Sequence, residues 1–212
     1  MTLLALTNAY RTLANGGRFS PVVLSSGRAA ATAAGAAANG VRAVADPSAV
    51  FLVTHILADN NARAGTFGLH SALSTPGFAA VKTGTSKDLR DNWCIGFTPR
   101  HTVGVWVGNA SGAPMHDVSG VSGAAPVWHA LVRHLHAAQP SRTPAAPAGV
   151  ERVAVAFDAR REPPRDELFL VGTAQPRQRA SAAVRHAGER AGIASPRDGS
   201  LYAIDPDIPP QA

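Results

Sequence analysis

Apolar residues recur at helical spacing in three stretches of the chain. The first stretch follows Thr2, a residue type that caps helices well, and it stops at the Asn15-Gly16-Gly17 turn. The second begins at Asp46-Pro47, where Asp suits the cap and Pro suits the first helical position. The third begins near Pro126 and ends near Gln139. The apolar stripes that predict these helices are Leu3, Leu6, Tyr10 and Leu13; Val50, Val53 and Leu57; and Val127, Leu131 and Leu135.

Strand-like patterns replace helical spacing between residues 78 and 109. The segments FAAVKTGT, WCIGF and TVGVWVGN are predicted strands, and the turn at 98–101 joins the last two as an antiparallel hairpin. Val103, Val105 and Val107 alternate with other residues, so one face of the hairpin should be buried. The order helix, helix, three strands, helix predicts an α+β fold, an antiparallel sheet flanked by helices. Three strands barely suffice for a stable sheet, so we expect that this fold is incomplete and that further strands belong to it.

Composition divides the rest of the chain. FSPVVL (19–24) is expected to be a short extended segment. Residues 25–45 are rich in small residues and predict a low-complexity, flexible surface insertion. Residues 140–149 have the composition of a linker. Beyond them, ERVAVAFD is expected to form an isolated strand in a poorly ordered tail rich in Arg and Pro. We therefore expect one unit over 1–139, a linker over 140–149 and a tail over 150–212 that includes the truncated start of a further domain.

Charge and cysteine content exclude several classes of function. The net charge of +6 comes from scattered arginines without a basic cluster, so we do not expect nucleic acid as a partner. The single cysteine, Cys94, lies in an apolar strand and is expected to be a buried, inert thiol. No apolar run reaches the ~18 residues of a membrane span, and the N-terminus does not resemble a signal peptide. Taken alone, the chain is expected to stay in the cytoplasm.

Metal and acid–base alternatives are weak. His129, His134 and His136 share a predicted helix, but their spacing lacks the i,i+4 pair of a zinc helix, so no metal or other cofactor is expected. Asp88 and Asp91 are expected to bond their own backbone in a turn. The three tryptophans, Trp93, Trp106 and Trp128, are expected to be core aromatics.

The stretch AVKTGTSKDLRDNW (80–93) carries the candidate chemistry, and it contains both lysines of the chain. A pleated strand presents Lys82 and Gly84 on one side and Thr83 and Thr85 on the other. Glycine lets a ligand backbone approach closely, and the lysine ammonium can hold a carboxylate. Lys82, Thr83, Gly84 and Thr85 are therefore the candidate site.

Lys-Thr-Gly on a strand resembles the third motif of the penicillin-binding proteins and serine β-lactamases. The longer run from Val81 to Trp128 resembles the 1C group of class A penicillin-binding proteins, the bifunctional peptidoglycan synthases, and LYAIDPDIPP resembles the entry to their C-terminal domain. The resemblance implies a transpeptidase/β-lactamase-like fold and an acyl-enzyme reaction at the D-Ala-D-Ala end of a peptidoglycan stem peptide, which β-lactams mimic. It also implies that the intact protein acts at the periplasmic face of the inner membrane.

The resemblance implies a role for each residue of the motif. Lys82 supports proton transfer and the electrostatics around the nucleophile. Thr83 and Thr85 hold the substrate carboxylate, and the backbone N–H of Thr85 is an oxyanion-hole donor.

Two further motifs of the family, Ser-x-x-Lys and Ser-x-Asn, do not occur in the 212 residues. We therefore expect the chain to be a transpeptidase fragment that is inactive alone and acts only with a missing N-terminal half. Two alternatives stay open. The chain is a non-catalytic remnant that binds the cell wall or a partner, or it is a piece of a serine β-lactamase or D,D-carboxypeptidase.

Overall fold

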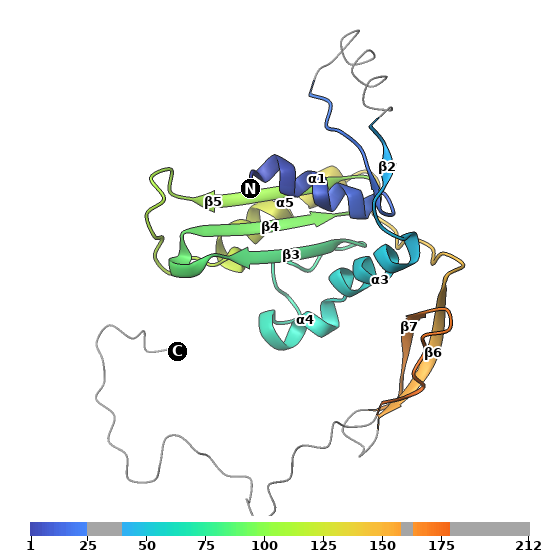
Figure 1. Ribbon diagram of the computed structural model, residues 1–212. Helices are drawn as coiled ribbons and strands as arrows, with labels where there is room; N and C mark the ends of the chain where they lie inside the picture. Colours follow the sequence, from blue (N-terminus) through green and yellow to red (C-terminus); the bar gives the residue numbers. More distant parts are fainter. Residues whose placement is uncertain (25–39, 158–162, 179–212) are drawn as a thin grey trace, which may run out of the picture.

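The computed structural model describes residues 1–24, 40–157 and 163–178. The centre of the fold is a three-stranded antiparallel sheet in the order β3-β4-β5, formed by β3 (Ala80–Thr85), β4 (Asp91–Phe97) and β5 (Thr102–Gly108). The helices are α1 (Leu3–Ala14), α3 (Pro47–Ala58), α4 (Asn60–Phe67) and α5 (Ala125–Leu135). In Figure 1, α1 and α5 lie on opposite faces of the sheet, and α3 and α4 lie beside β3. The predicted α+β fold, with its antiparallel sheet and flanking helices, is confirmed.

The helix starts agree with the capping residues seen in the sequence. The Thr2 hydroxyl accepts from Ala5 N at 3.2 Å, and the Asp46 carboxylate accepts from two backbone N–H groups at the start of α3. Helix α5 ends at Leu135, four residues earlier than expected.

Helix α4 directly follows α3 and occupies a segment for which the sequence analysis predicts no helix. The Asp59 carboxylate caps it by accepting from Asn61 N and Ala62 N, and Gly68 ends it at a φ of 76°. An Asp cap followed after eight residues by Gly is the sequence signal for this helix.

Two glycines in neighbouring strands allow one helix to pack closely on each face of the sheet. Gly96 pairs with Val103, and a Cβ placed on Gly96 would meet the Trp128 ring of α5 at 2.5 Å. Gly104 pairs with Ile95 on the opposite face, and a Cβ there would meet Thr7 of α1 at 2.1 Å. Both helices therefore reach the sheet because a side chain is missing beneath them.

The main core lies between the sheet and α5. Trp128 is fully buried at its centre, and Val105 is buried with Val103 and Val107 packed against the same cluster. The predicted burial of this alternating valine face is confirmed. The cluster comprises Leu73, Ala79, Val81, Cys94, Val105, Ala124, Ala125, Trp128 and Val132.

The C-terminal region contains a second sheet, so the expectation of an isolated strand is wrong. Strand β6 (Val150–Phe157) pairs antiparallel with β7 (Arg165–Leu170) and parallel with β8 (Arg177–Gln178). The hairpin contacts α3, and Val155 of β6 is almost fully buried. The Arg and Pro residues around β7 mask its apolar residues in the sequence.

The segments between these units are partly ordered. Strands β1 (Arg18–Phe19) and β2 (Arg42–Ala43) pair antiparallel, so the expected extended segment is shorter and earlier than 19–24. The predicted insertion lies mainly outside the described residues, and its end forms β2. The predicted linker packs against the body of the fold, since Ser141 O accepts from Phe78 N at 3.3 Å. None of the helices in the described ranges has the length and apolar character to cross a membrane.

Candidate functional site

Strand β3 is an edge strand that carries the Lys-Thr-Gly-Thr motif. Among the strands of the described ranges it pairs with β4 alone, and its first two residues, Ala80 and Val81, are buried. From Lys82 onwards the strand is open to solvent, and Lys82, Gly84 and Thr85 are exposed. The Lys82 ammonium donates to the carbonyl of Thr83 at 2.8 Å. The motif therefore offers an ammonium group, backbone amides and hydroxyls at one open edge.

The two sides of the motif have different surroundings. Thr83 and Thr85 face the turn η2 (Gly120–Ala124), where Gly120 N donates to the Thr85 hydroxyl at 2.9 Å. Gly84 lies on the opposite side, where an added Cβ would meet only the Cβ of Trp93 at 3.8 Å. The sequence did not single out Gly120, because a glycine in a Gly/Ser loop carries no chemical signal of its own.

Asn92 supports the motif from the neighbouring strand. It pairs with Thr85 in the sheet register and is fully buried. Its amide nitrogen donates to Val118 O at 2.7 Å, while its Oδ1 has no hydrogen-bond partner among the described residues. This contact ties the loop before η2 to the sheet beside Thr85.

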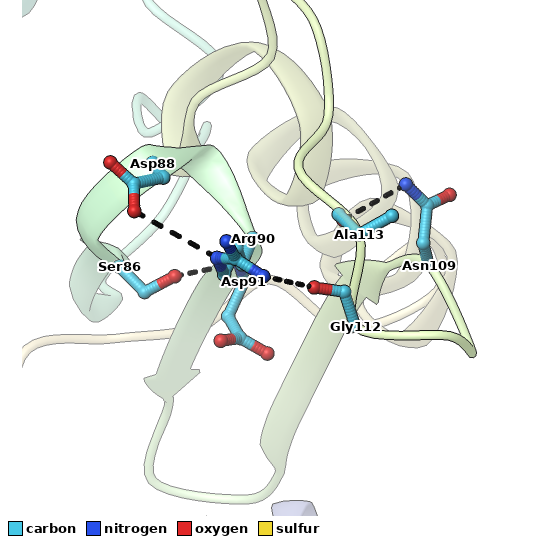
Figure 2. A network of polar contacts seen from close by, with 7 residues as sticks. All are labelled: Ser86, Asp88, Arg90, Asp91, Asn109, Gly112 and Ala113. Atoms are coloured by element: carbon cyan, nitrogen blue, oxygen red, sulfur yellow. Dashed lines mark hydrogen bonds and ion pairs between the residues drawn. The ribbon is translucent and has the colours of Figure 1, made fainter.

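A polar turn joins β3 to β4 at the end of the motif (Figure 2). Ser86 and Asp91 close the turn through two hydrogen bonds, in which Ser86 N donates to Asp91 O and Asp91 N donates to the Ser86 hydroxyl. Arg90 contacts Asp88 at 3.8 Å and donates to Gly112 O at 2.8 Å, which connects the turn to the loop after β5. These contacts therefore hold the end of the motif against β4 and the loop after β5.

Our expectation for the two turn carboxylates is wrong. The Asp91 side chain accepts from the Trp106 indole N–H at 2.9 Å, and Asp88 contacts Arg90 rather than its own backbone. Asp88 has a φ of 60°, a left-handed conformation that Asp tolerates better than most residues. Both groups are engaged in holding the turn, which agrees with a structural rather than an acid–base role.

Arg63 holds β3 from the side of α4. It donates to Leu57 O at the end of α3 at 2.6 Å and to Val81 O of β3 at 3.4 Å. Burial lowers the pKa of Arg63, and the charge of Asp59 partly opposes that shift. Nothing in the sequence singles out Arg63, since a lone arginine carries no signal of a contact to a distant strand.

Cys94 is buried behind the motif. Its side chain has no exposed surface, and burial raises the pKa of its thiol to about 12 against the opposing charge of Arg63. The expected inert thiol agrees with this environment.

The other singled-out residues do not gather at the motif. Trp128 is buried as expected, whereas Trp106 is 37% exposed and its assignment to the core is wrong. His129 contacts Ala72 O, and His136 contacts Thr98 and Gln139. Within the described ranges, the His, Cys, Asp and Glu residues form no group of three that could hold a metal ion.

Known proteins resemble the chain both in a segment of its sequence and in its fold. No protein-family model matches the chain. Penicillin-binding protein 1A of Clostridium botulinum (strain Langeland) is 35% identical over 69 residues, which are 32% of this chain and 8% of that protein. Penicillin-binding protein 1C of Escherichia coli K12 is 40% identical over 57 residues, 27% of this chain and 7% of that protein.

The fold resembles a solved structure of the same group. The crystal structure of penicillin-binding protein 1A from Haemophilus influenzae matches 82% of this chain and 32% of its own chain, with a TM-score of 0.60 and 18% identity. The matched sequence segments span less than a tenth of the two curated relatives. The chain is therefore similar to penicillin-binding proteins over a segment of its sequence, and its fold resembles that of penicillin-binding protein 1A.

Proposed function

We propose that residues 1–139 are the C-terminal part of a peptidoglycan D,D-transpeptidase domain and supply its substrate-binding strand. The observation that carries this proposal is the position of Lys82–Thr85 on the free edge of β3. A peptide laid along that edge would meet the ammonium group, the threonine hydroxyls and the backbone N–H groups together. The related proteins named above are penicillin-binding proteins, which agrees with a D-Ala-D-Ala stem peptide as the ligand and β-lactams as its mimics.

Each residue of the motif has a proposed role. The Lys82 ammonium supports proton transfer and the field at the nucleophile, after it leaves its present contact with Thr83 O. The Thr83 and Thr85 hydroxyls hold the terminal carboxylate. The Thr85 hydroxyl suits this role because it accepts from Gly120 N and so keeps its own proton to donate. The Thr85 N–H is the proposed oxyanion-hole donor, and Gly84 leaves room for the substrate backbone.

We further propose that these 212 residues alone do not catalyse the reaction. They contain no Ser-x-x-Lys and no Ser-x-Asn, so they lack the nucleophile, its base and the second motif. Loss of the nucleophile in a comparable acyl-transfer site lowers turnover by a factor on the order of 10⁶. Loss of an oxyanion donor lowers it by ~10²–10³. The β3 strand cannot replace either contribution.

Two experiments test the two parts of this proposal: peptide binding tests the substrate strand, and acylation by a penicillin tests the inactivity of the chain. A ¹⁵N-labelled sample of the chain should show amide shifts at Thr83 and Thr85 on titration with an N-acylated peptide ending in D-Ala-D-Ala. The same peptide ending in L-Ala-L-Ala should have little effect, and Lys82→Gln should weaken the response. Incubation with a penicillin should leave the mass of the chain unchanged. A stable increase by one penicillin would contradict the proposed inactivity, and no amide response would contradict the substrate strand.

A non-catalytic binding module is the second candidate, and the missing motifs favour it. In this second function, β3 binds the stem peptide or a cell-wall partner and no reaction follows. A fluorescent penicillin added together with a separately produced N-terminal half of the domain distinguishes the two. Labelling that needs both pieces supports a transpeptidase fragment, and stem-peptide binding without any labelling supports a binding module. In the transpeptidase reading, the working site lies at the periplasmic face of the inner membrane, residues 140–149 form a linker, and 150–212 begin a further domain.

A further inference from the structure

A cleft lies away from the motif, at the C-terminal end of α5. It has a volume of about 620 Å³, within the range of small-molecule sites. A second hollow of about 420 Å³ shares Pro140 and Ser141 with it. The residues of the Lys-Thr-Gly-Thr motif line neither hollow. We call the two together the α5 groove.

The α5 groove has an apolar floor and a cationic rim. Pro76, Phe78, Val132 and Ala137 contribute apolar surface to the larger hollow, beside the histidines His134 and His136. Arg133 lies on the rim of the larger hollow, and Arg100 and Arg142 line the smaller one. None of the described residues that line either hollow is Asp or Glu. The lining is therefore complementary to a negative charge attached to an apolar body.

Two arginines and one hydroxyl of the α5 groove have no partner of their own. Arg133 and Arg142 are exposed and make no hydrogen bond or ion pair with any described residue. The Ser141 Oγ is buried without a hydrogen-bond partner in the same part of the structure, although the backbone carbonyl of Ser141 accepts from Phe78 N. Because this oxygen is closed off from the groove in the present conformation, the hydroxyl would have to rotate toward the groove to bond a ligand head, and that bond would remove the free-energy cost of the missing partner.

We propose that the α5 groove binds a single-chain amphipathic anion, an alkyl chain with a carboxylate or phosphate head. The alkyl chain would cover the apolar floor, and the head would lie among Ser141, Arg133 and Arg142. A peptide fits less well, because its buried backbone amides would need partners that this floor does not provide. This site goes beyond the proposed transpeptidase function and does not depend on it.

The first test needs no variant. Dodecanoate and dodecyl phosphate, each below its critical micelle concentration, are titrated into the full chain by calorimetry, with dodecanol, acetate and inorganic phosphate as comparisons. We expect both amphipathic anions to bind saturably at one per chain. Dodecanol should bind about tenfold more weakly or worse, because it lacks the charge-assisted hydrogen bonds, and acetate and phosphate should not bind measurably. Binding of only one of the two anions would show which head group the rim selects and would support the site.

Matched variants locate the site. Ala130→Trp fills the larger hollow from the exposed surface of α5 and should abolish binding, whereas Val127→Trp, exposed on the same helix outside the lining, should not. Arg133→Gln and Arg142→Gln should each weaken binding by up to roughly fivefold, and Arg152→Gln on β6 should have no effect. Equal binding of dodecanol and dodecanoate, unsaturable binding, or full binding by Ala130→Trp would overturn the proposal. Binding to anionic vesicles but not to the monomeric anions would also overturn it.

Discussion

The contact between Gly96 and Trp128 predicts a large cost for adding a single methyl group. In Gly96→Ala, the new Cβ would lie 2.5 Å and 2.8 Å from two atoms of the Trp128 ring and 2.8 Å from the Ala80 carbonyl oxygen. The Trp128 ring cannot move aside because it is fully buried in the core. The Ala80 carbonyl cannot move aside because Ala80 belongs to the paired strand β3. Overpacking of this kind costs about 1–3 kcal/mol in the free energy of unfolding.

Gly84→Ala provides the matched control in the same sheet. Its new Cβ would meet only Trp93 Cβ at 3.8 Å, an ordinary contact. Since alanine loses less backbone entropy than glycine in a strand, this variant should be neutral or more stable by up to about 1 kcal/mol. It should nevertheless weaken binding of a D-Ala-D-Ala peptide, because the side chain would stand where the ligand backbone approaches.

Urea unfolding followed by tryptophan fluorescence measures both variants against the original chain. The midpoint should fall clearly for Gly96→Ala and not for Gly84→Ala, with the slope unchanged if unfolding stays two-state. Heating provides a second measurement, in which each kcal/mol corresponds to a shift of roughly 2–4 °C for a chain of this size. Equal stability of Gly96→Ala and the original chain would refute the close packing of α5 on β4.

Three further predictions concern other groups. Because the raised pKa of Cys94 makes thiolate rare, iodoacetamide should label the folded chain on the order of a thousandfold more slowly than the urea-unfolded chain at pH 8, and equal rates would contradict its burial. Burial, then His136 and Arg100, lower the pKa of His101, so the unfolded state binds the proton more readily. The free energy of unfolding should therefore fall as the pH drops below about 6.5. His101→Gln should make this free energy less dependent on pH in that range. Asp46→Ala removes the α3 cap and should cost ~1 kcal/mol in urea unfolding, whereas no change would show that the cap is dispensable.

Local signals in the sequence were sufficient for most of the central fold. Thr2 and Asp46 mark helix starts, and the alternation of Val103, Val105 and Val107 identifies a half-buried strand, because caps and periodicity act within a few residues. Two of the errors arose where contacts between residues far apart in the sequence decide the structure. Strand β6 pairs with β7 and β8, and Trp106 stays 37% exposed while its indole N–H donates to Asp91.

The motif itself could be located from sequence, but its supports could not. Lys82 to Thr85 stand out as a chemical pattern with a free charge and a glycine. Gly120, Asn92 and Arg63 support the motif through a backbone N–H, a buried amide and a contact to a strand carbonyl. Nothing in their residue types or spacing distinguishes them from ordinary loop, strand and helix residues, since each depends on the folded neighbourhood.

The contact of Lys82 with Thr83 O also affects the self-association of the chain. An unpaired strand edge is a template on which a second chain can add its own strand, and charged lysines at such edges oppose that pairing. Lys82 places an ammonium group on a backbone carbonyl of β3, so a neighbouring molecule would have to displace a hydrated charge before it could pair there. The residue that makes the strand attractive to an anionic peptide therefore also keeps identical strands apart, and neutral variants at this position should self-associate at lower concentration.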